Sequence, residues 1–303
     1  PLLDIEHHGD VSTSGKKSGD TITALTPMAP REEVVRSRTN PLFKHLRALK
    51  ERGVGPEGEL CLLEGPKLVE EALAAGVTIT EAAVGAKAVE RPAGATVVAA
   101  LRARGVPVRR LDDRLLGALS DAATSQGVLA LARRPPSDEA RLFEGTPLIL
   151  VAVGVQNPGN LGGLLRTAEA AGATGACLLE GCADPFSWKA LRGSMGSAFR
   201  LPLVAGGRTE PMLDRLEERG VRVLATGAHG ETRYDEADLA APVALLFGSE
   251  GAGLGEEVAE RAATRLRIPL APPVESLNVG VAAGLVLFEA ARQRGFPDPD
   301  GER

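Results

Sequence analysis

The stretch from Ile268 to Ala283 reads I-P-L-A-P-P-V-E-S-L-N-V-G-V-A-A and joins the end of an apolar strand to the start of a helix. Its prolines prevent regular pairing within the loop, because proline has no backbone N–H and a fixed φ angle. After Asn278, apolar residues recur at helical spacing, namely Val281, Leu285 and Phe288. We therefore expect a rigid polar loop on a buried support, an arrangement typical of binding sites. The alternative is a prolyl turn in which Ser276 or Asn278 only caps the helix.

Two earlier junctions also join an apolar strand to a glycine-rich turn. The run from Pro147 to Val153 suits a strand buried on both faces, and Q-N-P-G-N-L-G-G-L-L-R-T-A follows it. In that helix we expect Asn160 as the N-cap, while Gly162 and Gly163 indicate close approach of another backbone or a ligand. The second strand, from Val243 to Phe247, ends at G-S-E-G-A-G. Strands and helices that alternate in this way predict an α/β domain with a parallel sheet.

The G-S-E-G-A-G loop does not fit the usual dinucleotide-binding pattern. That pattern requires G-x-G-x-x-G after the first strand of the unit, with an acidic residue roughly 20 residues later. Here Gly255 is out of register, and Glu250 lies inside the loop. No G-K-[ST] sequence ends any of these turns, so a Walker loop is also absent from the sequence. A nicotinamide-dependent enzyme is therefore disfavoured.

A smaller α/β domain is predicted upstream. A helix from Pro66 to Ala75 should end at Gly76. Short apolar strands are expected at Leu60–Leu63, Ile79–Val84, Val106–Leu111 and Val128–Leu131. The segment from Arg133 to Asp138 is rich in proline and charge, which indicates a linker between the two domains.

A basic helix precedes these strands. Asn40 can be its N-cap and Pro41 its first residue. Its apolar stripe consists of Leu42, Leu46 and Leu49. The candidate RNA contacts are Arg36, Arg38, Lys44, Arg47 and Lys50. This cluster could bind phosphates, or it could be an ordinary solvated helix face.

Composition limits the classes of function. A length of 303 residues suggests two domains, and 44% hydrophobic with 25% charged residues is typical of a soluble globular chain. The formal net charge of -5 argues against a basic coat, although a local basic patch is still compatible with it. Three cysteines are too few for a disulfide framework or a zinc site, which fits a reducing cytoplasm. No apolar run approaches the roughly 20 residues of a membrane span.

Three stretches, in order, resemble the three motifs of the SpoU (TrmH-type) ribose methyltransferases of the SPOUT superfamily. They are N-P-G-N-L-G-G-L-L-R-T-A from Asn157, L-F-G-S-E-G-A-G-L from Leu246, and I-P-L-A-P-P-V-E-S-L-N-V from Ile268. Three ordered motifs are far more specific than one glycine loop. The resemblance implies a trefoil-knotted α/β domain that binds S-adenosylmethionine, an obligate homodimer with the site at the subunit interface, and methylation of an RNA ribose 2'-oxygen.

The leading domain carries S-R-T-N-P-L-F-K and L-L-E-G-P-K-L-V-E-E-A-L, and it resembles the ribosomal-protein-like RNA-binding domain of members that act on ribosomal RNA. The expected partners are therefore RNA, most of all ribosomal RNA, and a second copy of the chain, without a metal or a membrane. A transfer RNA methyltransferase and a catalytically silent RNA-binding member are the alternatives. The expected organisation is a disordered leader (1–34), an RNA-binding domain (35–135), a linker (136–145), a methyltransferase domain (146–296) and a tail (297–303).

The resemblance also implies roles for individual residues. The polar site positions of the three motifs are matched by Asn160, Arg166, Glu250, Ser276 and Asn278. Positions expected to hold the cofactor, largely through their backbones, are matched by Gly248, Ile268, Leu270 and Leu277. Arg166 suits charge stabilisation and phosphate positioning better than proton abstraction, because a guanidinium stays protonated in proteins. Val153 stands where many relatives carry an acid, and Gly280 where serine is usual.

Overall fold

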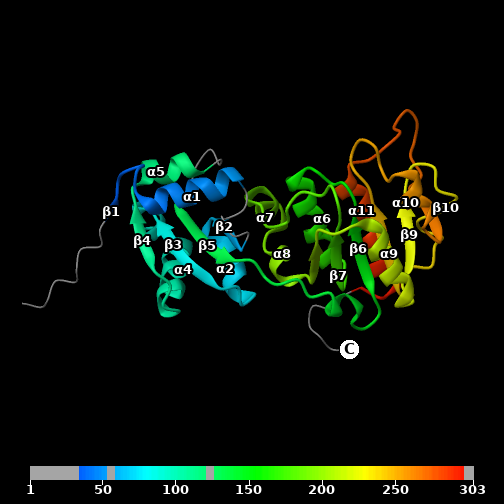
Figure 1. The fold of residues 1–303 in the computed structure, drawn as a ribbon, viewed down its shortest axis with the longest axis horizontal. Helices are drawn as coiled ribbons and strands as arrows, with labels where there is room; N and C mark the ends of the chain where they lie inside the picture. Colours follow the sequence, from blue (N-terminus) through cyan, green and yellow to red (C-terminus); the bar gives the residue numbers. More distant parts are fainter. Residues whose placement is uncertain (1–33, 53–58, 121–125, 297–303) are drawn as a thin grey trace, which may run out of the picture. The chain divides into compact units, whose positions relative to one another are not determined.

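The computed structural model describes residues 34–52, 59–120 and 126–296. These residues form two β-sheets with flanking helices (Figure 1). One sheet has five strands and the other has seven. The expected tail and nearly all of the expected leader lie outside the described residues. The exception is Val34, which was assigned to the leader but begins a short strand that pairs with a later one.

The five-stranded sheet is mixed and has the order β1-β4-β3-β5-β2. Strands β1 and β3 run parallel to β4, whereas β5 runs antiparallel to both β3 and β2. Its strands are β1 (Val34–Val35), β2 (Leu60–Glu64), β3 (Ile79–Val84), β4 (Val108–Leu111) and β5 (Val128–Arg133). Its helices are α1 (Pro41–Arg52), α2 (Pro66–Ala74), α3 (Ala86–Val89), α4 (Pro92–Ala103) and α5 (Asp113–Leu119).

Helix α1 begins as the sequence predicts but buries a slightly different stripe. The N–H of Leu42 donates to Asn40 Oδ1 at 2.9 Å, which is an N-cap contact. The buried residues are Phe43, Leu46 and Leu49, at 1–3% exposure, while Leu42 is only half-buried. Residues three apart lie on neighbouring positions of one helix face, so Phe43 rather than Leu42 completes the stripe.

The seven-stranded sheet is parallel throughout its described strands and has the order β10-β12-β9-β11-β6-β7-β8. Its strands are β6 (Leu148–Ala152), β7 (Gly175–Leu178), β8 (Leu203–Ala205), β9 (Arg222–Thr226), β10 (Thr232–Arg233), β11 (Val243–Phe247) and β12 (Thr264–Arg267). The chain builds outward from β6 through β7 and β8, then continues on the other side of β6. Ligands of open α/β sheets bind at the carboxyl ends of strands where the order reverses in this way.

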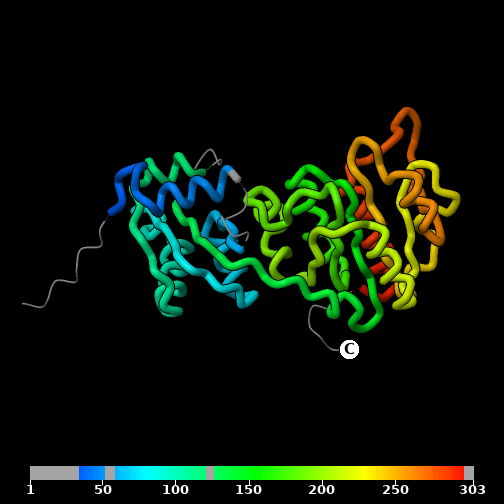
Figure 2. Tube along the Cα trace, in the orientation of Figure 1, coloured from blue at the N-terminus to red at the C-terminus, as the bar shows by residue number. Residues whose placement is uncertain are grey.

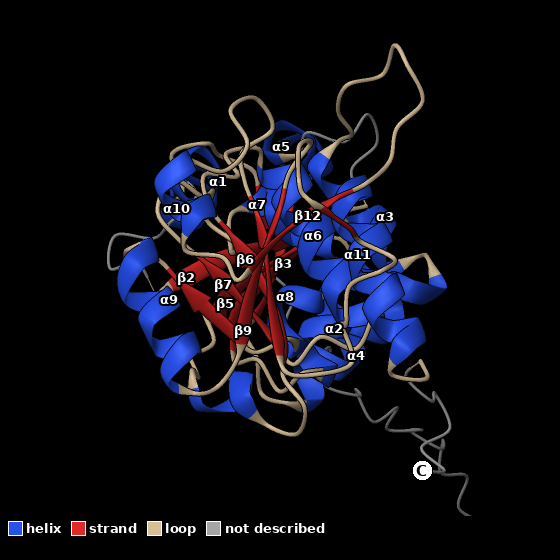
Figure 3. Ribbon diagram, turned by 90° about the vertical axis from the view of Figure 1, so that its right-hand side faces the viewer, coloured by secondary structure: helices blue, strands red, loops and turns tan. Residues whose placement is uncertain are grey.

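Helices cover both faces of this sheet (Figure 3). Its helical segments are η1 (Ala140–Phe143), α6 (Pro158–Ala170), α7 (Trp188–Ser194), α8 (Ser197–Arg200), α9 (Thr209–Glu218), α10 (Glu256–Glu260) and α11 (Val279–Gln293). Alternate residues of β6 point to opposite sides: Leu150 packs with residues of α6 and α11, and Val151 packs with residues of α9. The prediction of a strand buried on both faces is confirmed.

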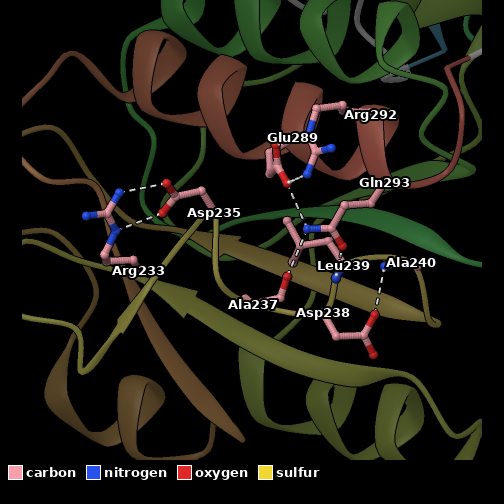
Figure 4. Close-up of polar contacts among 9 residues, drawn as sticks. All are labelled: Arg233, Asp235, Ala237, Asp238, Leu239, Ala240, Glu289, Arg292 and Gln293. Carbon is pink, nitrogen blue, oxygen red and sulfur yellow. Dashed lines mark hydrogen bonds and ion pairs between the residues drawn. The ribbon is translucent and has the colours of Figure 1, made fainter.

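The carboxyl end of α11 is held in place by polar contacts (Figure 4). Gln293 accepts from the N–H of Leu239 at 2.7 Å and donates to the carbonyl of Ala237 at 2.9 Å. Arg294 donates to the carbonyls of Leu239 and Pro147, at 2.8 and 3.0 Å. These contacts anchor α11 to the segments that lead into β11 and β6.

The apolar residues whose helical spacing predicted α11 lie on the exposed side of the helix. Val281, Leu285 and Phe288 are 53, 38 and 44% exposed. The buried residues are instead Val279, Ala283, Val286, Leu287, Ala290 and Ala291. Because α11 is apolar on almost every side, its spacing predicts the helix but cannot identify the buried face. Within the described part of the chain, no helix is both long and apolar enough to cross a membrane.

Candidate active site

A cavity of about 450 Å³ lies at the carboxyl ends of β9, β11 and β12. Its volume falls within the range of about 300–1,000 Å³ that is common for small-molecule sites. The loops after these strands and the start of α11 form its wall. That wall includes Gly248, Ile268, Leu270 and Leu277, the residues expected to hold a cofactor. Residues from two separate sequence motifs therefore meet around one cavity.

The loop after β11 is closed on itself beside the cavity. The N–H of Ser249 donates to the carbonyl of Gly253, and the N–H of Gly253 donates back to Ser249, each at 3.0 Å. A side-chain carbon on Gly248 would lie 2.1 Å from the carbonyl carbon of Gly253. This loop conformation therefore requires glycine at 248, and the cavity wall has no side chain there.

The loop after β9 contributes residues that no sequence motif identified. Thr226 and the exposed His229 both line the cavity. The loop packs closely against β12. A side-chain carbon on Gly230 would lie 2.5 Å from the Arg265 carbonyl oxygen. The Arg267 guanidinium donates to the Gly230 carbonyl at 3.0 Å. Only the topology could have indicated these residues as part of the site, since β9 ends at the same edge of the parallel sheet as β11.

Three of the predicted polar residues form one hydrogen-bonded chain. Asn160 Nδ2 donates to Glu250 Oε1 at 2.8 Å, and Asn278 Nδ2 donates to Asn160 Oδ1 at 3.3 Å. In Figure 2 the green segment after β6 and the orange segment after β11 accordingly lie side by side. Asn278 Oδ1 also accepts from the N–H of Gly280 at 2.9 Å. Asn278 thus serves both as the helix cap and as a member of this polar chain.

The prediction that Asn160 caps its helix is wrong. The N-cap of α6 is Asn157, whose Oδ1 accepts from the N–H groups of Gly159 and Asn160 at 2.8 and 3.2 Å. Pro158 occupies the first helical position, which favours a cap on the residue immediately before it. The side chain of Asn160 is consequently free to contact Glu250.

The remaining polar candidates have different surroundings. Ser276 is exposed and lines the cavity, as does Glu250. Arg166 is exposed on α6, outside the cavity lining, and forms no hydrogen bond or ion pair with any described residue. The described chain therefore brings together every predicted polar site residue except Arg166.

The glycines of α6 differ in their surroundings. A side-chain carbon on Gly162 would lie 2.3 Å from the carbonyl oxygen of Ala190 and 2.8 Å from the nitrogen of Ser194, both in α7. The prediction of a close backbone approach is confirmed at this position. At Gly163, by contrast, no described atom outside the adjoining backbone of α6 lies within 4 Å of the same point.

The basic candidates cluster on and just before α1. Four of them are exposed, namely Arg36, Arg38, Lys44 and Arg47. Arg47 forms an ion pair with Glu51 at 2.7 Å. The half-buried Lys50 places its ammonium group 5.3 Å from the centroid of the Trp188 ring. Among the described residues, no three His, Cys, Asp or Glu side chains gather in a group that could hold a metal ion.

Known protein families match both parts of the chain. The model of the SpoU rRNA Methylase family matches residues 147–288, and that of an MRM3-like substrate binding domain matches residues 40–130. An uncharacterized tRNA/rRNA methyltransferase of Synechocystis is 36% identical, over 89% of this chain and 97% of the relative. The 23S rRNA (guanosine(2553)-2'-O)-methyltransferase RlmP of Bacillus subtilis is 33% identical, over 81% of this chain and 93% of its own.

Solved structures agree with these matches. A crystal structure of an RNA 2'-O ribose methyltransferase has a TM-score of 0.75 and 37% identity, covering 87% of this chain and 100% of the other. An AdoMet-bound rRNA methyltransferase from Sinorhizobium meliloti has a TM-score of 0.74 and 35% identity, covering 86% and 97%. The α/β fold with its parallel sheet is thus the fold of these methyltransferases. The length and identity of these matches, together with three motifs assembled at one sheet edge, show that the chain belongs to the SpoU rRNA methylase family.

Proposed function

We propose that the protein is an S-adenosylmethionine-dependent methyltransferase that methylates a ribose 2'-hydroxyl of ribosomal RNA. The observation that carries this proposal is the position of the Glu250–Asn160–Asn278 chain, since Glu250 lines the cavity together with Ser276. The relatives support the substrate, because RlmP and RlmB proteins are named as 23S rRNA guanosine-2'-O-methyltransferases. The AdoMet-bound neighbours support the cofactor.

The cavity fits S-adenosylmethionine in volume and in chemistry. Ile268, Leu270 and Leu277 give its wall an apolar part that can cover a purine ring. The absence of a side chain at Gly248 lets the loop after β11 close against Gly253, which keeps the backbone groups of this loop at the cavity wall. When bound, this cofactor supplies a methyl group carried on a sulfonium. The chain's own task is to hold the ribose oxygen in line with that group and to stabilise the charge that develops on the oxygen.

We assign this task to the polar residues as follows. Arg166 stabilises the negative charge that develops on the ribose 2'-oxygen as the hydroxyl proton passes to solvent water, and it positions a neighbouring phosphate, because its planar guanidinium can donate two hydrogen bonds. Asn160, Ser276 and Asn278 orient the ribose and the arginine. Glu250 accepts a hydrogen bond from Asn160 and so fixes the loop after β11 relative to the start of α6.

We further propose that a homodimer completes the site. Arg166 lies outside the cavity lining of its own chain. The exposed apolar residues Val281, Leu285 and Phe288 form a face of α11 that a second copy could bury. Two copies joined there would place an α6 helix of one subunit near the α11 helix of the other, because these two helices pack together within each chain. An Arg166 from the partner subunit can then act at the cavity, which agrees with the site at the subunit interface that the family resemblance implies.

The domain roles also belong to this proposal. Residues 146–296 would form a trefoil-knotted methyltransferase domain, joined by the linker 136–145 to an RNA-binding domain at 35–135. The match of a substrate binding domain model to residues 40–130 supports the second assignment. The basic residues at α1, from Arg36 to Lys50, would contact RNA phosphates. We also propose that the protein acts in the cytoplasm, where it would meet a ribosomal RNA substrate.

A methylation assay with two RNAs tests the proposed function. The protein and S-adenosylmethionine are incubated with an unmodified 23S rRNA transcript or with unmodified transfer RNA, and the ribose methylation of each is mapped by mass spectrometry. We expect one 2'-O-methylated nucleotide in the 23S transcript and no modification in the transfer RNA. Calorimetry should show binding of S-adenosylmethionine but not of NAD. Tight NAD binding without a response to S-adenosylmethionine would refute the proposal.

A further inference from the structure

Helix α7 presents two cations that the proposed site does not use. Its inner side is buried, with Trp188, Ala190, Leu191 and Ser194. Its outer side exposes Lys189 and Arg192. Neither side chain forms a hydrogen bond or an ion pair with any residue in the described ranges. Arg200 of the adjoining α8 differs, because it is paired with Glu169 at 2.6 Å.

Arg192 is held in place despite having no acidic partner. Its guanidinium carbon lies 4.8 Å from the centroid of the Trp188 ring, within the range of a cation–π contact. Trp188 itself is only 5% exposed, so the ring is a fixed support. When the flat face of a guanidinium stacks on an aromatic ring, its N–H donors point outward from the guanidinium edge and stay available. Arg192 is therefore preorganised to donate hydrogen bonds to an incoming anion.

A second cation lies near the same ring. The ammonium of Lys50 is 5.3 Å from the ring centroid, and Arg192 is 4.8 Å from it, so the two charges are at most about 10 Å apart.

The α7 cations also adjoin the helix that carries the proposed catalytic arginine. Gly162 of α6 is packed closely against the backbone of α7, since a side-chain carbon on Gly162 would lie 2.8 Å from the Ser194 nitrogen. Arg166 follows Gly162 by one helical turn, so it lies on a nearby part of the same side of α6. A chain of phosphates bound along α7 would thus lead toward Arg166.

We propose that Lys189 and Arg192 form a phosphate-binding site for the RNA backbone, here named the α7 site. It rests on the proposed function, since it supplies binding for the same RNA substrate. Its role is to hold the strand next to the methylated nucleotide and not to select the sequence, because phosphate contacts position a nucleic acid without reading its bases. Lys50 extends the α7 site toward the basic residues of α1.

The test measures the affinity for an unmodified 23S rRNA transcript as a function of salt concentration. The double variant Lys189→Gln and Arg192→Gln should lower the slope of log K against log salt by about 1 to 2, since each lost phosphate contact removes nearly one unit. At about 0.1 M salt the affinity should fall roughly ten- to a hundred-fold. Affinity for S-adenosylmethionine should stay within a factor of about two, because neither residue lines the cavity.

A matched control is available on the opposite face of the sheet. Arg219 follows α9 and lies over the Phe143 ring at the same 4.8 Å, and Arg208 is an exposed cation at the start of that helix. The variant Arg208→Gln and Arg219→Gln therefore removes the same charge and one comparable stacking contact, and it should keep the parental slope. The variant Arg192→Lys preserves the charge, so it should keep most of the slope of log K against log salt. A loss in the double variant that Arg192→Lys does not share is then due to the missing charge and not to a folding defect.

The outcomes separate this inference from the proposed function. If the parent methylates the transcript while the α7 double variant keeps the parental affinity and slope, the α7 site is wrong and the proposed function stands. Equal losses in the α7 variant and the α9 control would also overturn the α7 site, because they would reflect net charge alone. If the parent neither binds nor methylates RNA, both proposals fail.

Discussion

Asn160 donates a hydrogen bond to Glu250 at 2.8 Å and accepts one from Asn278 at 3.3 Å, so its amide can take only one orientation in this chain. The donor must face the carboxylate and the acceptor must face the other amide. A residue with two acceptors cannot make both contacts. The relationship therefore gives a direct test of whether these residues act as a unit.

Asn160→Asp should disrupt the site while keeping its shape. The change replaces the donor that faces Glu250 by a carboxylate oxygen, and two carboxylates at this distance repel each other. We expect the methyl-transfer rate to fall by about 100-fold, with a smaller effect on cofactor affinity. Single-turnover kinetics at saturating RNA measures the rate. The double variant Asn160→Asp with Glu250→Gln removes the repulsion, and if it recovers no activity relative to Asn160→Asp, the proposed coupling is absent.

Gly248→Ala should weaken cofactor binding. The added carbon would lie 2.1 Å from the Gly253 carbonyl carbon, so the loop after β11 would have to open. We expect the Kd for S-adenosylmethionine, measured by calorimetry, to rise more than about tenfold. Gly251→Ala is the matched control in the same loop, because nothing lies within 4 Å of the corresponding point and its φ is not positive. Equal effects of the two substitutions would contradict the steric explanation.

Arg166→Ala should separate chemistry from cofactor binding. Arg166 lies outside the cavity lining, so cofactor affinity should change by no more than a few-fold. The rate of methyl transfer should fall by about 100-fold or more, the scale expected when one preorganised charge is lost. Arg166→Lys keeps the charge but not the planar fork, and we expect poor rescue. A parental rate for Arg166→Ala would move the catalytic role to other residues.

Phe288→Asp should weaken self-association. Phe288 is 44% exposed on α11, and a carboxylate placed there would be costly to bury in a subunit interface. Light scattering coupled to size exclusion should show a dimer for the parent and a shift toward monomer for the variant, with loss of methyl transfer. Val34→Asp is the control, since Val34 is another apolar residue with 36% exposure but lies in the first sheet. A monomeric parent with full activity would refute the dimer proposal.

The three cysteines should resist alkylation in the folded protein. Burial raises the pKa of the Cys61 and Cys177 thiols to about 12, and it also raises the pKa of the half-buried Cys182. Because the thiolate is the reactive form, each should react with iodoacetamide at pH 8 at least about tenfold more slowly than free cysteine. Intact mass after timed labelling measures this. Rapid labelling in native buffer, at a rate equal to that in denaturant, would contradict the burial.

The elements that sequence predicts well are long and strongly patterned. Strands β3 and β11 occur at the predicted positions, and a short apolar run between turns, such as V-A-L-L-F in β11, favours a fully buried strand. Helices α7 and α8 were not predicted. They have seven and four residues, and neither has a side-chain hydrogen bond at its N-cap, so both local signals are weak. Their positions depend on tertiary contacts, such as the backbone contact between α7 and Gly162.

Prediction of the candidate site has the same limit, because features that depend on tertiary contacts leave little local signal in the sequence. Motif resemblance identified the residues around the cavity, since loop closure at Gly248 and capping at Asn278 demand particular residue types. It could not distinguish Asn157 from Asn160 as the cap, because both are good caps three residues apart. His229 was missed because the turn that carries it is shaped by contacts with β12 that are distant in sequence.

The hydrogen bond between Asn160 and Asn278 spans 118 residues of chain. At the usual synthesis rate of about 5–20 residues per second, roughly 6–24 seconds separate the translation of these two residues. During that interval β6 and α6 and then β11 can form, but α11 has not yet joined them. A nascent chain therefore exposes the surface of α6 that α11 covers for many seconds on the ribosome, and it acquires the Asn160–Asn278 contact only when α11, the last helix of the described residues, emerges.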